Sequence, residues 1–150
     1  QSMSDSEEKK EKDVEAEEED EDEDDFSSLK STRKRYSCPQ NDEYRLFIEK
    51  SELDPGEVSR DDEVKHMLQY ALCAPSDSAS IQGVLTRRVL FKGKEVFKDS
   101  GSETFKAGTW EITAEISVPE KAPVGKYTLE TTIRHEKIFV KRNAIFFVKP

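Results

Sequence analysis

The chain has 150 residues, of which 33% are hydrophobic and 38% charged, and its formal net charge is −9. The charge is unevenly placed. Residues 4–25 hold fifteen Asp/Glu and three Lys, a net charge of −12, whereas the rest of the chain carries a net charge of +3. A uniformly acidic body is therefore excluded, and no apolar run approaches the length of a membrane span. We expect two parts: residues 1–35 as a tag remnant plus a disordered acidic tether, and residues 36–150 as one folded domain.

The acidic run contains nine consecutive acids, Glu17 to Asp25, and almost nothing apolar. We interpret it as a solvated spacer, because it has too little apolar surface to offset the entropy of ordering. Two alternatives remain open, an arm that binds a basic partner and loose binding of divalent cations. An EF-hand loop is excluded, because its central Gly and spaced ligands are absent. The basic cluster at residues 33–35 is interpreted as a solvated boundary, because three charges are weak evidence for a nucleic-acid site.

The clearest element of the body is the alternating segment 109–118, in which Trp110, Ile112 and Val118 fall on one face and Glu111 and Glu115 on the other. This period of two predicts a half-buried β-strand. A loop with two prolines and a glycine follows, and then a second alternating strand begins near Tyr127. We therefore predict that Trp110 and Tyr127 belong to the structural core.

Further strands are predicted on both sides of this pair. Residues 43–50 form the first, 81–91 a long one that contains Arg87 and Arg88, and 138–148 the last, with a bulge or bend at 141–143. A short strand is expected at 95–98, followed by a turn at Asp99-Ser100-Gly101. Residues 64–74 fit both a strand and a helical stripe. We favour the strand.

The two cysteines support that choice. Cys38 and Cys73 each lie seventeen residues from the Pro55-Gly56 turn signal, so they would meet at the open end of a hairpin formed about that turn. A disulfide would close a loop of about 35 residues and contribute on the order of 3–4 kcal/mol. The alternative is a pair of reduced, partly buried thiols. No zinc-binding spacing is present, so no metal site is predicted.

About seven short strands with frequent turns predict an all-β, antiparallel β-sandwich. Within it, Gly108-Thr109-Trp110, Val118-Pro119 and Pro123-Val124-Gly125-Lys126-Tyr127 resemble the strand, proline loop and Gly-x-Tyr of immunoglobulin-like domains in bacterial secreted and lipid-anchored proteins. The resemblance covers mainly residues 105–134. It implies an immunoglobulin-like sandwich in which the Tyr127 hydroxyl turns back to the loop backbone. The antibody-type Cys-Trp-Cys core is absent, so this is not an antibody-family domain.

Function is less clearly indicated. An acidic spacer before such a domain is similar to the tether of bacterial lipoproteins, which implies a non-enzymatic binding or adaptor module in the periplasm or at the cell surface, with a protein partner. A membrane would be contacted only through a lipid anchor outside this chain. The candidate partner contacts are charged strand residues, namely Arg87, Arg88, Lys141 and Arg142.

The alternative is an intracellular acidic chaperone-like protein that binds basic clients through residues 7–25. We predict no catalytic residues, because His66 and His135 are far apart and no nucleophile elbow or phosphate loop is present. No cofactor and no nucleic-acid partner are expected.

Overall fold

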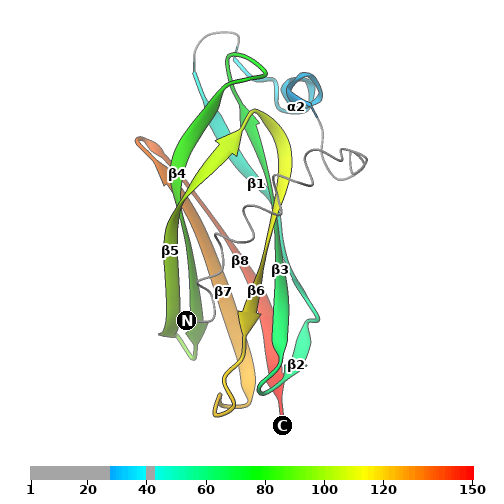
Figure 1. Cartoon of the computed structure of the whole chain (residues 1–150), viewed down its shortest axis with the longest axis vertical. Helices are drawn as coiled ribbons and strands as arrows, with labels where there is room; N and C mark the ends of the chain where they lie inside the picture. The colour runs from blue at the N-terminus through cyan, green and yellow to red at the C-terminus, as the bar shows by residue number, and fades with distance from the viewer. Residues whose placement is uncertain (1–27, 40–42) are drawn as a thin grey trace.

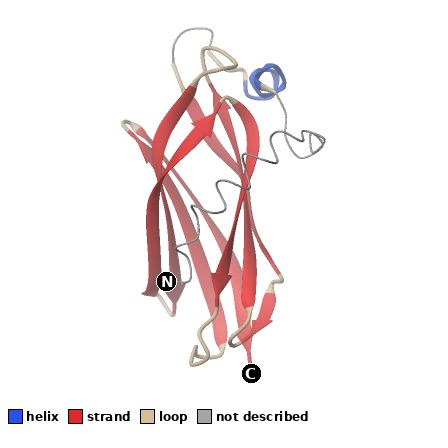
Figure 2. Cartoon of the chain, viewed as in Figure 1, coloured by secondary structure: helices blue, strands red, loops and turns tan. Residues whose placement is uncertain are grey.

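The computed structural model describes residues 28–39 and 43–150, which form one helix and eight strands. Figure 1 shows the two layers of strands with the helix at one end, and Figure 2 shows how strongly strand predominates. No helix in these ranges is long and apolar enough to cross a membrane. The elements are α2 (Leu29–Tyr36), β1 (Arg45–Asp54), β2 (Glu57–Ser59), β3 (Glu63–Cys73), β4 (Ser80–Phe91), β5 (Lys94–Lys106), β6 (Gly108–Ser117), β7 (Gly125–His135) and β8 (Ile138–Lys149).

The strands form two sheets of unequal width. Sheet A has three strands in the order β1-β3-β6, and sheet B has five in the order β2-β8-β7-β4-β5. All neighbours are antiparallel except β2 and β8, which are parallel. The two sheets form a largely antiparallel β-sandwich in which β1 and β2, separated by only two residues, join different sheets. The predicted fold class is therefore confirmed, with the short strand β2 as an unforeseen eighth strand.

Most strand predictions are confirmed. Residues 63–73 form a strand, as favoured over the helix, and β3 pairs with β1, but the connection between them runs through β2 of the other sheet and is not a tight turn at Pro55-Gly56. The turn predicted at Asp99-Ser100-Gly101 is wrong, because these residues lie inside β5 and pair with Arg87, Thr86 and Leu85 of β4. Small and polar residues are tolerated there because β5 lies at the edge of its sheet.

Helix α2 lies in the region that the sequence assigned to the tether. Its N-cap residue Ser28 accepts a hydrogen bond from the Ser31 N–H, and Leu29 and Thr32 are buried against the sandwich. The Thr32 and Thr109 hydroxyls lie 2.8 Å apart. Arg33 donates to the carbonyl oxygen of Ala74 at 2.7 Å. The body packed around the core therefore includes residues before Tyr36.

Cys38 and Cys73 form a disulfide, with Cα atoms 5.5 Å apart. The predicted bond is confirmed, although Cys38 follows the end of α2 and is not part of a strand. The bond joins the helix to the last residue of β3. It therefore ties the segment that follows α2 to sheet A.

The core consists of two hydrophobic clusters, one on each side of a polar layer. The cluster nearer α2 is built around residues such as Leu68, Phe105 and Ile133. The other is built around residues such as Val89 and Leu129. Between them, each of three strands contributes one fully buried polar residue: His66, Arg87 and Thr131.

Candidate binding site on the open side of the sandwich

The two long sides of the sandwich differ. On the side of β1 and β8, the Arg142 guanidinium donates a hydrogen bond of 2.6 Å to the backbone carbonyl oxygen of Ile48, so the two sheets are joined there. On the other side, sheet A ends at β6 and sheet B ends at β5. Figure 1 shows these two strands running apart from the corner where one leads into the other. We call this the open side.

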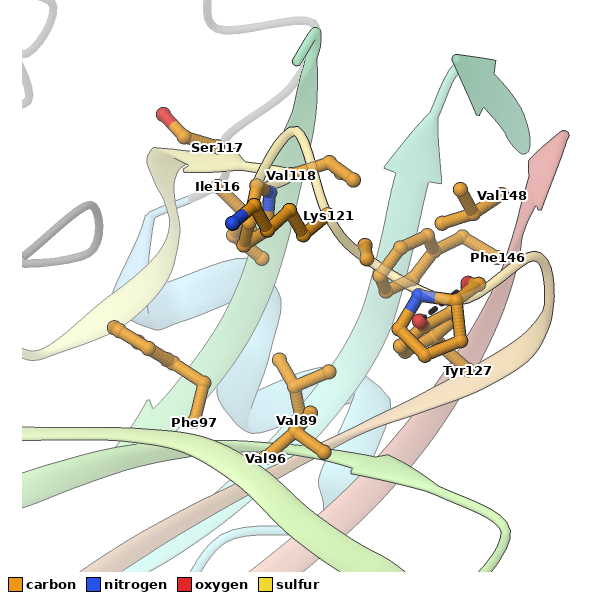
Figure 3. Close-up of a pocket in the computed structure, with 13 residues that line it drawn as sticks. Val89, Val96, Phe97, Ile116, Ser117, Val118, Lys121, Tyr127, Phe146 and Val148 are labelled. Carbon is orange, nitrogen blue, oxygen red and sulfur yellow. Dashed lines mark hydrogen bonds between the residues drawn. The ribbon is translucent and has the colours of Figure 1, made fainter. Parts of the chain in front are cut away.

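An apolar cavity of about 280 Å³ lies on the open side. Figure 3 shows Val96 and Phe97 of β5 on one wall and Ile116 and Val118 on another. Other lining residues are shared with the second core cluster, and include Val89, Tyr127, Phe146 and Val148. Because sheet A does not extend over β5, part of the core is reached from outside the molecule.

The cavity is bounded at one end by the loop between β6 and β7, which three hydrogen bonds hold in place. The Tyr127 hydroxyl donates a 2.6 Å hydrogen bond to the carbonyl oxygen of Pro123. Arg60 donates to the carbonyl oxygen of Ala122 at 2.7 Å, and the Val118 N–H donates to the carbonyl oxygen of Asp62 at 2.8 Å. The hydroxyl geometry implied by the tyrosine-corner resemblance is therefore present. This wall of the cavity is preformed.

The cavity lining is suited to binding apolar groups. Lys121 is its one charged residue, and the lining contains no carboxylate and no histidine. Across residues 28–39 and 43–150, no group of His, Cys, Asp and Glu could hold a metal ion. An apolar site with a single cation favours burial of a hydrophobic side chain or chain segment.

Arg87, one of the predicted partner contacts, belongs to the buried polar layer. Arg87 was expected on the surface, but only 1% of it is exposed. Its Nε donates a 2.9 Å hydrogen bond to Nδ1 of His66. Burial, partly offset by the charges of Glu103 and Asp99, lowers the pKa of Arg87 to about 10, so it is charged at neutral pH. Arg87 therefore cannot contact a partner from this position.

His66 is neutral in this layer. Its Nδ1 accepts from Arg87, so its proton lies on Nε2, which is 2.9 Å from the Ser51 hydroxyl. Burial, together with the adjacent Arg87 charge, holds the pKa of His66 well below its ordinary value. The layer crosses from sheet A to sheet B and fixes their alignment.

Two of the remaining candidate contacts lie together on the outer face of sheet B. Arg88 donates to Glu130 at 2.8 Å and to Glu95 at 3.2 Å, and the Lys141 ammonium lies 3.4 Å from Glu130. These hydrogen bonds, that from Arg88 foremost, lower the pKa of Glu130. The structure therefore brings Arg88 and Lys141 together, and places Arg142 on the closed side instead.

Trp110 is only partly buried. It packs against the first core cluster, and its indole N–H donates to the carbonyl oxygen of Ala107 at 2.9 Å. The Lys106 ammonium lies 4.3 Å from the ring centroid. Tyr127, by contrast, is buried in the second cluster.

Sequence reasoning missed the residues of the open side. Val96 and Phe97 were placed in a strand, but nothing marked them as accessible. Val96 lies where the β4–β5 register shifts, between the pairs Val89–Phe97 and Leu90–Glu95. Two consecutive apolar residues in an otherwise polar segment were the available signal, since they break the period of two.

Comparisons with known proteins show the fold alone. No protein-family model matches the sequence, and no curated protein matches it. Among solved structures, the alkylpurine DNA glycosylase AlkC of Pseudomonas fluorescens, bound to DNA containing an abasic site analog, is similar at a TM-score of 0.52 and 9% identity, over 79% of this chain and 33% of that chain.

Two further structures are similar at lower TM-scores. The β-glucuronidase of Parabacteroides merdae has a TM-score of 0.47 and 17% identity, over 69% of this chain and 14% of that chain. The sporulation control protein Spo0M of Bacillus subtilis has a TM-score of 0.46 and 16% identity, over 71% and 49%. The chain spans less than half the length of each of the three structures.

Proposed function

We propose that the chain is a non-enzymatic binding or adaptor module of a bacterial envelope, held on the acidic spacer of residues 4–25, and that it contacts a protein partner through an edge strand or the sandwich loops. The observation that carries this proposal is the open side, where two strand edges that no other described strand pairs with flank an apolar cavity. Such edges provide backbone hydrogen-bonding groups, and the adjacent cavity provides a place for a side chain.

The chemistry of the cavity supports binding over catalysis. Hydrolysis of a glycosidic bond uses a pair of carboxylic acids that flank it, and none of the lining residues is an acid. The glucuronidase named above is several times longer than the stretch that this chain matches. Its activity therefore gives no support to an enzymatic function here.

The disulfide supports the proposed location in the bacterial envelope. Cys38–Cys73 is consistent with an extracellular or periplasmic location, because disulfides persist mainly in oxidising compartments. An intracellular acidic chaperone would need no such bond. We therefore favour the envelope, with a lipid anchor ahead of the acidic spacer.

Photo-crosslinking in an envelope extract of the source organism tests this proposal. A benzophenone amino acid is placed in the full chain at Val96 on the open side, at Ser78 in an end loop, or at Val84 as the control. Val96 and Val84 are comparably exposed, at 54% and 46%. We expect a discrete adduct from Val96 or Ser78 that excess unmodified chain removes, and none from Val84.

The proposal would be contradicted if neither Val96 nor Ser78 gave an adduct that excess unmodified chain removes. A chain lacking residues 7–25 distinguishes the envelope module from the alternative function, an intracellular acidic chaperone. The envelope module keeps its adduct without them, whereas an acidic chaperone loses its basic clients.

A further inference from the structure

Sheet A has room for a fourth strand. Immunoglobulin-like sandwiches of the constant type have four strands in the corresponding sheet. Here the sheet contains β1, β3 and β6, and within the described ranges no strand pairs with the outer edge of β6. On the facing sheet, β5 extends beyond the last strand of sheet A. The position beside β6 therefore lies over β5 and over the cavity between them.

The side chains under this position are arranged to receive an apolar group. Phe97 lies opposite Val89 of β4 and shares its inward direction, and both line the cavity. Val96 also lines the cavity although it is 54% exposed, because the register shift at this point turns it toward the open side. Figure 3 shows Val96 and Phe97 separated from Ile116 by this space.

The charged residues of β5 and β6 indicate which of these two edge strands is better suited to pair with an added strand. Along β5, Lys94, Lys98 and Lys106 alternate with acids, and Asp99 lies on the inward-facing register opposite Arg87. Charged and inward-pointing residues of this kind protect an edge strand from pairing. The edge of β6 differs in having apolar inward residues, since Ile112 and Ile116 are buried, and its charged residues Glu111 and Glu115 alternate with them on the outer face.

The outer face of β6 indicates the charge of the occupant. Glu115 lies opposite Lys65 of β3 in the β3–β6 register. A basic residue on a strand added at the other edge of β6 would repeat this cross-strand pairing of opposite charges. Lys121, at the loop end of the cavity, disfavours a second basic residue there.

We propose that an extended segment of the partner protein adds to the free edge of β6 as the fourth strand of sheet A. One apolar side chain of the segment enters the cavity beside Val96, and a basic residue lies next to Glu115. The inference rests on the proposed function and names its partner as a strand-forming peptide segment. Backbone hydrogen bonds supply most of the affinity, and the cavity supplies the specificity.

A selected peptide tests this inference. A phage-displayed library of ten-residue segments with apolar residues at alternate positions is selected against the full chain, and the recovered segments are synthesised. We expect Val96→Asp to weaken their binding by at least about tenfold, because a carboxylate would enter an apolar cavity. The matched substitution Val84→Asp, on the outer face of β4, should change binding by less than about twofold.

Backbone methylation distinguishes strand addition from simple side-chain binding. Alternate amides of a strand point to opposite sides, so N-methylation of one alternate set removes the hydrogen bonds to β6 and methylation of the other leaves them. We expect only one set to abolish binding. Any of three results would overturn the inference. The library gives no binder, Val96→Asp leaves the binding of the selected segments unchanged, or both methylated sets bind equally well.

These outcomes are distinguishable from failure of the proposed function. A competed adduct from Ser78 alone, in the crosslinking experiment, would leave a binding module that uses its loops and would overturn strand addition. An adduct from Val96 together with edge-specific methylation supports both.

Discussion

Tyr127 joins the start of β7 to the loop that bounds the cavity. Its ring stacks on Phe91 and Phe146, with centroids 4.6 and 5.3 Å away, while its hydroxyl donates to Pro123. Burial raises the pKa of this hydroxyl, so it keeps its proton for the hydrogen bond at physiological pH. One side chain thus contributes to the core and to the shape of the cavity.

Tyr127→Phe should lower the free energy of unfolding by about 1–3 kcal/mol, because the Pro123 carbonyl loses its donor. Urea denaturation measures the change. Tyr44→Phe is the control, since Tyr44 packs on the core and its hydroxyl makes no hydrogen bond with the described residues. Equal effects of the two substitutions would contradict the role given to the Tyr127 hydroxyl.

Arg87 shows where residue-level prediction fails. Its neighbours in the sequence follow strict alternation, and Arg87 occupies an inward position between Leu85 and Val89. The sequence therefore placed it correctly on a strand, but a charge argued for exposure. Only the structure shows the compensating groups: the His66 acceptor from the other sheet, and the nearby charges of Glu103 and Asp99.

The lowered pKa of His66 predicts acid sensitivity. Below pH 6.5 the unfolded state binds a proton at His66 that the folded state does not, so stability falls as pH falls from this value. The loss attributable to His66 approaches about 1.4 kcal/mol per pH unit. Unfolding free energies from pH 8 to pH 5 should show this slope in the wild type and in His135→Gln, and a flatter one in His66→Gln. A similar slope in all three proteins would exclude His66 as the cause.

At the scale of elements, α2 is held by several independent contacts. Tyr36 stacks on Phe47 with ring centroids 4.1 Å apart, and Arg35 forms a 2.7 Å ion pair with Glu49. Burial acts to raise the pKa of Glu49, but hydrogen bonds from Tyr36, Gln69 and Arg35 together outweigh it and lower the pKa. These contacts hold α2 on the sandwich. The sequence suggested a solvated boundary instead, because the helix is rich in exposed Lys and Arg.

Leu29→Ala should cost about 2–5 kcal/mol of unfolding free energy, because Leu29 is buried in the first core cluster. Lys30→Ala, at the exposed neighbouring position of the same helix, should be nearly neutral. Thermal and urea unfolding of both variants measure the difference. A neutral Leu29→Ala would show that α2 does not pack on the body.

The edge strand β5 marks another limit of sequence reasoning. Asp99-Ser100-Gly101 has the composition of a turn, yet the pairing with β4 extends through it. Alternation identified β6 and β7 because each has one face in the core. An edge strand that is apolar only at its ends gives no such pattern.

At the scale of the whole molecule, the unequal sheets define the site. A sequence predicts the strands that are present, but the vacant position beside β6 depends on which sheet each strand joins. The disulfide and the sandwich were predictable from spacing and alternation. The cavity was not, since its residues come from β4, β5, β6, β7, β8 and a loop.

Hydrogen exchange of the full chain, alone and saturated with a selected segment, tests the open side most directly. We predict that the segment slows amide exchange in residues 112–117 of β6, while exchange in β1, the strand at the other, closed side of sheet A, stays unchanged. Slowed exchange confined to β1, β2 or the end loops, with β6 unaffected, would contradict the account.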